Sequence, residues 1–184
     1  DSNDAGSPFV PRPVRSVVGD PRSLMGAPDG RHFAFVDFND HDWVSHKLYL
    51  SEITETTSPR LITDNICGAN QMVSFTPDGW QVVVVDNDRS VVTWDIQTGR
   101  SVASFATIPT SFRGEWSREM NMSLSPDGET LALSSFSDRG IDLWHTKTGR
   151  LLYSLPERSG VVYWIAWSPD SQRLAVSRSN GEIE

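Results

Sequence analysis

Ser74-Phe75-Thr76-Pro77-Asp78-Gly79 is a short apolar segment followed by a turn, and the same pattern recurs along the chain. It returns at 123–128 as Ser-Leu-Ser-Pro-Asp-Gly and at 166–171 as Ala-Trp-Ser-Pro-Asp-Ser, and a weaker copy stands at 27–30. The aspartates of the four copies are separated by steps of 49, 49 and 43 residues, at Asp29, Asp78, Asp127 and Asp170. A fixed period of this size predicts a repeat architecture.

The second repeat predicts one complete structural unit. Strands are expected at 72–75, 81–85, 91–96 and 101–105, and the β-branched run at 81–85 suits a strand buried on both faces. Pro77-Asp78-Gly79 supplies the first turn, because proline fixes φ, aspartate hydrogen-bonds its own backbone and glycine accepts a positive φ. Four short antiparallel strands joined by tight turns form a blade of a β-propeller.

The third repeat copies this order. Its strands are expected at 122–124, 130–134, 141–144 and 151–155. Trp144 falls 50 residues after Trp94, and Thr148-Gly149-Arg150 falls 50 residues after Thr98-Gly99-Arg100. Because unrelated positions share one offset, the periodic tryptophans are interpreted as packing residues. Trp80 follows a turn glycine outside this pattern, and we expect it to be exposed.

The segment Trp94-Asp95-Ile96-Gln97-Thr98-Gly99-Arg100, after its turn and apolar strand, resembles the tryptophan–aspartate (WD) repeat. Residues 143–150 carry the same motif with His145 in place of the aspartate, and the resemblance extends from about residue 70 to residue 184. It implies a WD-repeat propeller of bacterial type. The family's Gly-His pair, whose histidine joins a network with a turn aspartate, a hydroxyl and the tryptophan, does not occur here.

Eight residues are assigned structural roles by the repeats and by this resemblance. They are Trp94, Asp95, Trp144, Asp78, Asp127 and Asp170, with Asp88 and Asp138 at the turn-aspartate position of the network. The first repeat differs from the others, and over 27–36, 47–53 and 59–63 it resembles TolB-like propeller repeats. The same blade layout is expected for it.

The last repeat is cut short in the sequence. Strands are expected at 164–167 and 173–177 with a hairpin turn at Asn180-Gly181, and the sequence stops at Glu184. Open strand edges are avoided in folded proteins, and propellers usually have about 4 to 8 blades. About three and a half all-β blades of a larger, 7- or 8-bladed ring are therefore expected. Alternatively, residues 9–10 or 14–18 supply the missing strand, or two chains associate to close the ring.

The expected segments follow from these strands. They are an N-terminal extension or strand at 1–20, blades at 21–64, 65–107 and 121–157, an inserted loop at 108–120, and an incomplete blade at 158–184.

Composition excludes several classes of function. The net charge of −8 argues against phosphate-driven nucleic-acid binding, and no apolar stretch approaches the length of a membrane span. Cys67 is the one cysteine, which excludes an internal disulfide and slightly favours the cytoplasm, with the periplasm left open. Neither a phosphate loop nor a Gly-x-Ser-x-Gly elbow nor a His-Glu-x-x-His pair occurs, so no catalytic or cofactor-binding residues are assigned.

The inserted loop carries the candidate partner-binding residues, Phe112, Arg113, Trp116 and Arg118. Tryptophan and arginine dominate the residues that carry interface energy, although local packing against a blade edge is the commoner fate of a loop aromatic. The loop at 38–46 holds two aspartates and two histidines, but their spacing matches no zinc or calcium pattern, and a solvated polar loop is favoured over a metal site.

These features favour a non-catalytic scaffold that binds a protein or peptide through its loop face. The alternative is the propeller part of a larger enzyme, a hydrolase or kinase, that gates substrate or senses a ligand.

Overall fold

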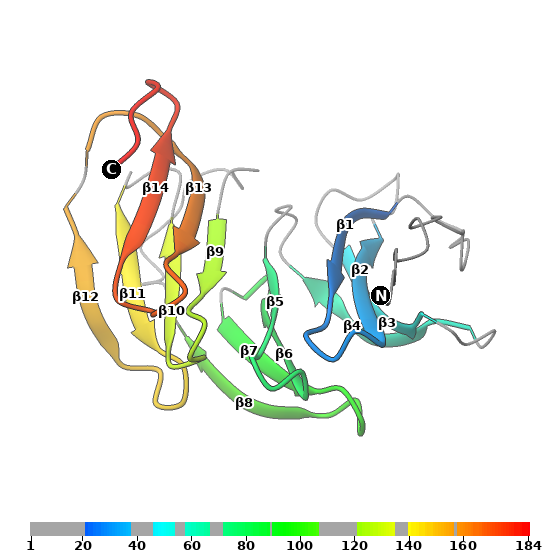
Figure 1. Cartoon of the computed structure of the whole chain (residues 1–184). Coiled ribbons are helices and arrows are strands. Elements are labelled where there is room, and N and C mark those ends of the chain that lie inside the picture. The colour runs from blue at the N-terminus through cyan, green and yellow to red at the C-terminus, as the bar shows by residue number, and fades with distance from the viewer. Residues whose placement is uncertain are drawn as a thin grey trace, which may run out of the picture.

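The chain folds into β-sheets connected in chain order (Figure 1). The structure is a computed structural model that describes residues 21–37, 46–53, 58–66, 72–88, 90–106, 121–134, 140–156 and 158–184. Every strand pair in these residues is antiparallel. The first sheet, blade 1, has the order β1 (Pro21–Gly26), β2 (His32–Asp37), β3 (His46–Glu52) and β4 (Arg60–Ile66).

Three further sheets follow the same plan. Blade 2 contains β5 (Val73–Phe75), β6 (Gln81–Val85), β7 (Ser90–Asp95) and β8 (Ser101–Ala106). Blade 3 contains β9 (Asn121–Leu124), β10 (Thr130–Ser134), β11 (Ile141–His145) and β12 (Leu151–Leu155). Blade 4 contains β13 (Val162–Trp167) and β14 (Leu174–Arg178), which the isolated bridge between Ser177 and Ile183 extends.

The first strands of the blades connect one sheet to the next. Strand β1 contacts β5, β5 contacts β9, and β9 contacts β13, so the first strands of successive blades are neighbours. The fold class predicted from the sequence, an all-β propeller of four-stranded antiparallel blades, is therefore confirmed. Residues 9–10 and 14–18, the alternative sources of the missing strand, lie outside the described residues.

The core lies between the blades. Successive side chains of a strand point to opposite faces of its sheet. In β6, Val82 and Val84 pack in the apolar cluster shared with blade 1, whereas Val83 and Val85 pack in the cluster shared with blade 3. All four valines are at most 2% exposed. This two-sided burial explains the uninterrupted β-branched run in the sequence.

The same division applies at each interface between blades. In β10, Leu131 and Leu133 face blade 2 and Ala132 faces blade 4. A hydrogen bond adds to the contact between blades 3 and 4, where the indole Nε1 of Trp167 donates to the carbonyl oxygen of Ser123 at 3.0 Å. Each blade thus depends on its neighbours to bury its two faces.

The repeated Pro-Asp turn is held by one hydrogen-bonding unit. In blade 2 the Thr76 hydroxyl donates to Asp78 Oδ1 at 2.6 Å, the Trp80 amide donates to the same oxygen at 3.0 Å, and the Gln81 amide donates to Thr76 Oγ1. Blades 3 and 4 repeat the hydroxyl contact at 2.5 Å, from Ser125 to Asp127 and from Ser168 to Asp170. These hydroxyl and amide donors lower the pKa of all three aspartates.

These turns also stack on one another from blade to blade. A Cβ atom built on Gly128 would lie 2.9 Å from Cδ of Pro77, and one built on Gly79 would lie 3.7 Å from Cδ of Pro28. Ser171 takes the glycine position in blade 4 with φ 60°, and its hydroxyl accepts a hydrogen bond from the Asp127 amide at 3.1 Å. The turn motif therefore fixes the spacing of successive blades as well as the strand register.

The second repeated turn is closed by a side chain at the end of the third strand. In blade 2, Asp95 Oδ1 accepts hydrogen bonds from the amide and the hydroxyl of Thr98, at 2.6 and 2.7 Å. In blade 3, Nδ1 of His145 contacts the amide and the hydroxyl of Thr148, at 3.2 and 3.1 Å. The histidine thus takes over the role of the aspartate that it replaces in the repeat.

The periodic tryptophans pack between blades, as their spacing predicts. Trp94 packs against the cluster between blades 1 and 2, and Trp144 against the next cluster, with its ring 6.3 Å from the ring of Phe105. The Nε1 atoms of both tryptophans are buried without a hydrogen-bond partner. Asp88 is exposed, and Asp138 lies outside the described residues. The hydrogen-bonded network of the WD repeat is therefore not completed at either indole.

None of the described residues forms a helix long and apolar enough to cross a membrane.

Gly149 provides a test of the packing between blades. It has φ +63°, and a Cβ atom there would lie 2.5 Å from Cβ of Phe105 in blade 2. Gly149→Ala is expected to lower the free energy of unfolding by about 3 kcal/mol, because the strain of a positive φ adds to an overlap with an atom fixed to the backbone. Chemical denaturation measures this change.

Gly30→Ala is the matched control. Gly30 has φ +66° but nothing within 4 Å of a built Cβ, so only the conformational cost of about 1 kcal/mol is expected. Equal losses in the two variants would show that contact with Phe105 does not constrain the turn.

Candidate functional site

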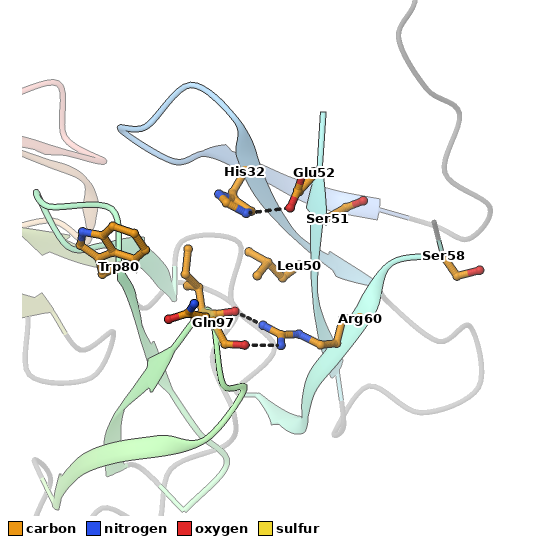
Figure 2. A pocket seen from close by; sticks show the side chains of 9 residues that line it. His32, Leu50, Ser51, Glu52, Ser58, Arg60, Trp80 and Gln97 are labelled. Atoms are coloured by element: carbon orange, nitrogen blue, oxygen red, sulfur yellow. Dashed lines mark hydrogen bonds and ion pairs between the residues drawn. The ribbon is translucent and has the colours of Figure 1, made fainter. Parts of the chain in front are cut away.

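A groove of about 370 Å³ opens between blades 1 and 2, at the rim that carries the Pro-Asp turns. Blade 1 supplies the ends of β2, β3 and β4, and blade 2 supplies Trp80 at the end of its first turn and Ile96 and Gln97 within its second turn (Figure 2). The side chains on which its chemistry depends are those of His32, Leu50, Glu52, Arg60, Trp80 and Gln97.

An equivalent groove of about 460 Å³ lies between blades 2 and 3, which allows the two to be compared position by position. In the pairing of the second and third strands, His32 lies opposite Glu52 in blade 1, and Gln81 lies opposite Asp95 at the same place in blade 2. In the pairing of the third and fourth strands, Leu50 lies opposite Arg60 in blade 1, and Thr93 lies opposite Ala103 in blade 2. On the blade 2 side, Trp80 and Gln97 correspond to Glu129 and Lys147 of blade 3. Residues that differ between the grooves are not required by the blade architecture.

Trp80 is the most distinctive residue of the first groove. Its carbonyl oxygen accepts a hydrogen bond from the Ile96 amide at 3.0 Å, and the Glu129 carbonyl accepts the same bond from Thr146 in blade 3. The backbone at this position is therefore fixed, whereas the side chain is 60% exposed, which confirms the exposure expected from the sequence. Figure 2 shows the indole at one wall of the groove.

Arg60 ties the two blades together at the end of the groove. Its Nη1 donates to the Gln97 carbonyl at 2.9 Å, and its Nη2 donates to the Ile96 carbonyl. The guanidinium also lies against Gly99. Asp95 is close by, and its pKa is lowered, mainly by the amide and hydroxyl of Thr98 and to a lesser degree by the positive charge of Arg60. The donors of Arg60 are thus directed to the backbone of blade 2.

His32 lies between two carboxylates on the opposite wall. Its Nδ1 is 2.5 Å from Asp29 Oδ2, and its Nε2 is 3.5 Å from Glu52 Oε1. Desolvation opposes ionisation of Asp29, but hydrogen bonds from the His32 amide, the His32 ring and the Arg31 amide lower the pKa of Asp29 to about 2. Asp29 is therefore ionised at neutral pH, and the wall formed by these side chains carries negative charge.

The candidate partner-binding residues from the sequence, Phe112, Arg113, Trp116 and Arg118, lie outside the described residues. Strand β8 ends before them at Ala106 and β9 begins after them at Asn121, and these strand ends lie at the rim opposite to the Pro-Asp turns. Residues 38–45 of the polar loop also lie outside the described residues. Within the part of the chain that the structure describes, no three His, Cys, Asp or Glu side chains are placed to hold a metal ion.

Sequence reasoning did not identify the groove. Its two walls come from repeats that are one period apart, and nothing in the repeat pattern marks Glu52 or Arg60. The residue that could have indicated the groove is Trp80, because it is an aromatic side chain outside the periodic positions.

The blades, their shared cores and the grooves between them define a β-propeller repeat protein. Its repeats are similar to those of WD-repeat proteins and of TolB. An uncharacterized WD repeat-containing protein of Synechocystis sp. is 23% identical over 156 residues, which cover 65% of this chain and 45% of that protein. The Tol-Pal system protein TolB of Haemophilus influenzae is 33% identical over 105 residues, covering 56% of this chain and 22% of TolB.

A third similarity is shorter. The U5 small nuclear ribonucleoprotein 40 kDa protein of Pongo abelii is 34% identical over 70 residues, which cover 35% of this chain and 19% of that protein. No family model matches the chain. The chain spans less than half of the length of these curated relatives. The resemblance to WD and TolB-like repeats is confirmed.

The pairing of Asp29 with His32 predicts a pH-dependent contribution to stability. A carboxylate whose folded-state pKa is lowered stabilises the fold above its unfolded pKa of about 3.9, and this stabilisation is lost as the pH falls through the folded pKa. Asp29→Asn is therefore expected to lower the free energy of unfolding at pH 6. The difference from the wild type should shrink between about pH 4 and pH 2.

Urea denaturation at a series of pH values measures this difference. Solvent screens this partly exposed pair, so the effect at pH 6 should be smaller than that of a buried pair. A difference that stays constant down to pH 2 would show that the carboxylate charge of Asp29 has no part in it.

Proposed function

We propose that this propeller is a non-catalytic scaffold for protein interactions and that it contacts a partner protein at the groove between blades 1 and 2. The observation that carries the proposal is the exposed indole of Trp80 at a position where the other blades carry Arg31, Glu129 and Gln172. Because the blade tolerates each of these side chains, its own packing does not explain the tryptophan.

The size and composition of the groove support this use. A volume of about 370 Å³ is within the range of sites that take a side chain or a small ligand. Tryptophan is enriched among the residues that dominate binding energy, because its ring buries a large area at little conformational cost. The buried side chain of Leu50 adds an apolar surface beneath it.

A second contact region is proposed from the sequence. The insertion at 108–120 carries Phe112, Arg113, Trp116 and Arg118, which have the composition of a loop that binds a partner. The strands that flank it end at the opposite rim from the groove, so the two regions serve different partners or different parts of a large one.

Trp80→Glu tests the groove. The substitution introduces the residue that blade 3 carries at the equivalent position, so the blade is expected to fold with an unchanged unfolding midpoint. Capture of partner proteins from an extract of the source cells should fall at least about tenfold for partners that use the groove, since central aromatic residues of interfaces contribute about 2 kcal/mol or more. Quantitative mass spectrometry of the captured proteins measures the loss.

Glu129→Trp is the reciprocal control, because it places an indole at the second groove without the surroundings of the first. It should not create a second binding site for the same partners. The double variant Phe112→Ala, Trp116→Ala tests the inserted loop in the same assay. Capture of the same partners by both Trp80→Glu and the double variant Phe112→Ala, Trp116→Ala would contradict the proposed contact surfaces.

A further inference from the structure

We infer that the groove between blades 1 and 2 binds a cationic side chain, that of lysine or arginine, presented by the partner protein. This inference rests on the proposed function and names the chemistry that the groove selects. Its basis is the combination of an exposed indole, an exposed carboxylate and an apolar floor around one opening (Figure 2).

The carboxylate is that of Glu52. Its side chain is 43% exposed and reaches toward the groove from the end of β3. Its contact in the fold is with Nε2 of His32 at 3.5 Å, which is longer than a hydrogen bond to a histidine ring normally is. His32 in turn is held at 2.5 Å by Asp29. Within the described residues, Glu52 thus makes one long ion pair with His32, and its exposed carboxylate can also accept hydrogen bonds from an ammonium or guanidinium group.

The indole and the floor suit the rest of such a side chain. A cation is attracted to the face of a tryptophan ring within about 6 Å of its centroid. The methylene stem of lysine or arginine buries along apolar surface while its charged group stays in a polar environment. Trp80 provides the ring and Leu50, 6% exposed, provides the apolar surface.

The positive charge of Arg60 does not oppose this cation strongly. Two of its nitrogens donate to the Ile96 and Gln97 carbonyls. Asp95 lies near enough for the charge of Arg60 to make a small contribution to lowering the pKa of that carboxyl. Arg60 thus closes the end of the groove, and the exposed carboxylate of Glu52 is the negative group offered to a ligand.

The second groove indicates what the first one lacks. Between blades 2 and 3 the lining includes Asp78, Asp127 and a lysine of the chain itself, Lys147. In the first groove the equivalent position is the uncharged Gln97, and the exposed indole of Trp80 stands where blade 3 carries Glu129. In the first groove the basic side chain of Arg60 donates to the backbone of blade 2, and the exposed carboxylate of Glu52 is left to pair with a partner's cation.

Titration with short peptides tests the inference. The probes are fluorescein-labelled Gly-Ser peptides that carry a single lysine, arginine, glutamine or glutamate at the central position, and fluorescence anisotropy reports binding. The lysine and arginine peptides are expected to bind at least about fivefold more tightly than the glutamine peptide, with the glutamate peptide weakest. The preference should decrease as salt is raised from 20 mM to about 500 mM, because added ions screen exposed charges.

Two variants locate the site. Glu52→Gln removes the charge without changing the shape, and Trp80→Leu removes the ring while keeping an apolar side chain. Each should reduce the preference for lysine over glutamine to less than about twofold. Glu129→Gln makes the same charge change at the blade 3 position that corresponds to Trp80, outside the first groove, and should leave the preference unchanged.

Equal binding of the lysine and glutamine peptides would overturn the inference, and so would a lysine preference that survives both Glu52→Gln and Trp80→Leu. If partner capture is lost in Trp80→Glu while the peptides show no charge preference, the interaction scaffold stands and the cation site fails. If neither assay responds to these substitutions, both fail.

Discussion

The structure depends on one constraint, which is that a single blade cannot bury both of its faces. Strand β6 shows this most clearly, because Val82 and Val84 are covered by blade 1 and Val83 and Val85 by blade 3. The central strands of blades 2 and 3 are therefore shared between two apolar clusters, and the blades must be held at a constant spacing. The stacked Pro-Asp turns, with Gly128 against Pro77, set that spacing at the rim.

The candidate site follows from the same constraint. Apolar packing between blades ends at the rim, and the grooves lie there between the ends of one blade's strands and the turns of the next. The backbone at these positions is fixed by repeated hydrogen bonds, such as those to the carbonyls of Trp80 and Glu129, while the side chains vary. The propeller thus offers similar grooves with different chemistry at equivalent places, which suits a scaffold.

Periodicity made the fold predictable and the site largely unpredictable. Trp94, Trp144 and the turn aspartates recur at one offset, so their packing roles and the four-stranded blades follow from the sequence alone. The missing Gly-His pair already argued against a complete hydrogen-bonded network at the tryptophans, and the described residues complete none. One local detail did not follow: His145 closes its turn in place of aspartate. The groove joins side chains from two repeats, and only their packing brings Glu52, Arg60 and Trp80 together.

The central claim is that a partner's side chain occupies the groove beside Trp80 while the periodic tryptophans serve packing alone. Nuclear magnetic resonance of the indole N–H groups tests it most directly, with the Trp80 signal assigned from Trp80→Phe. On addition of the lysine peptide, we expect a saturable shift of the Trp80 signal and unchanged signals from Trp94 and Trp144, whose indole Nε1 atoms are buried between blades. An unmoved Trp80 signal, or shifts of equal size at Trp94 and Trp144, would contradict it.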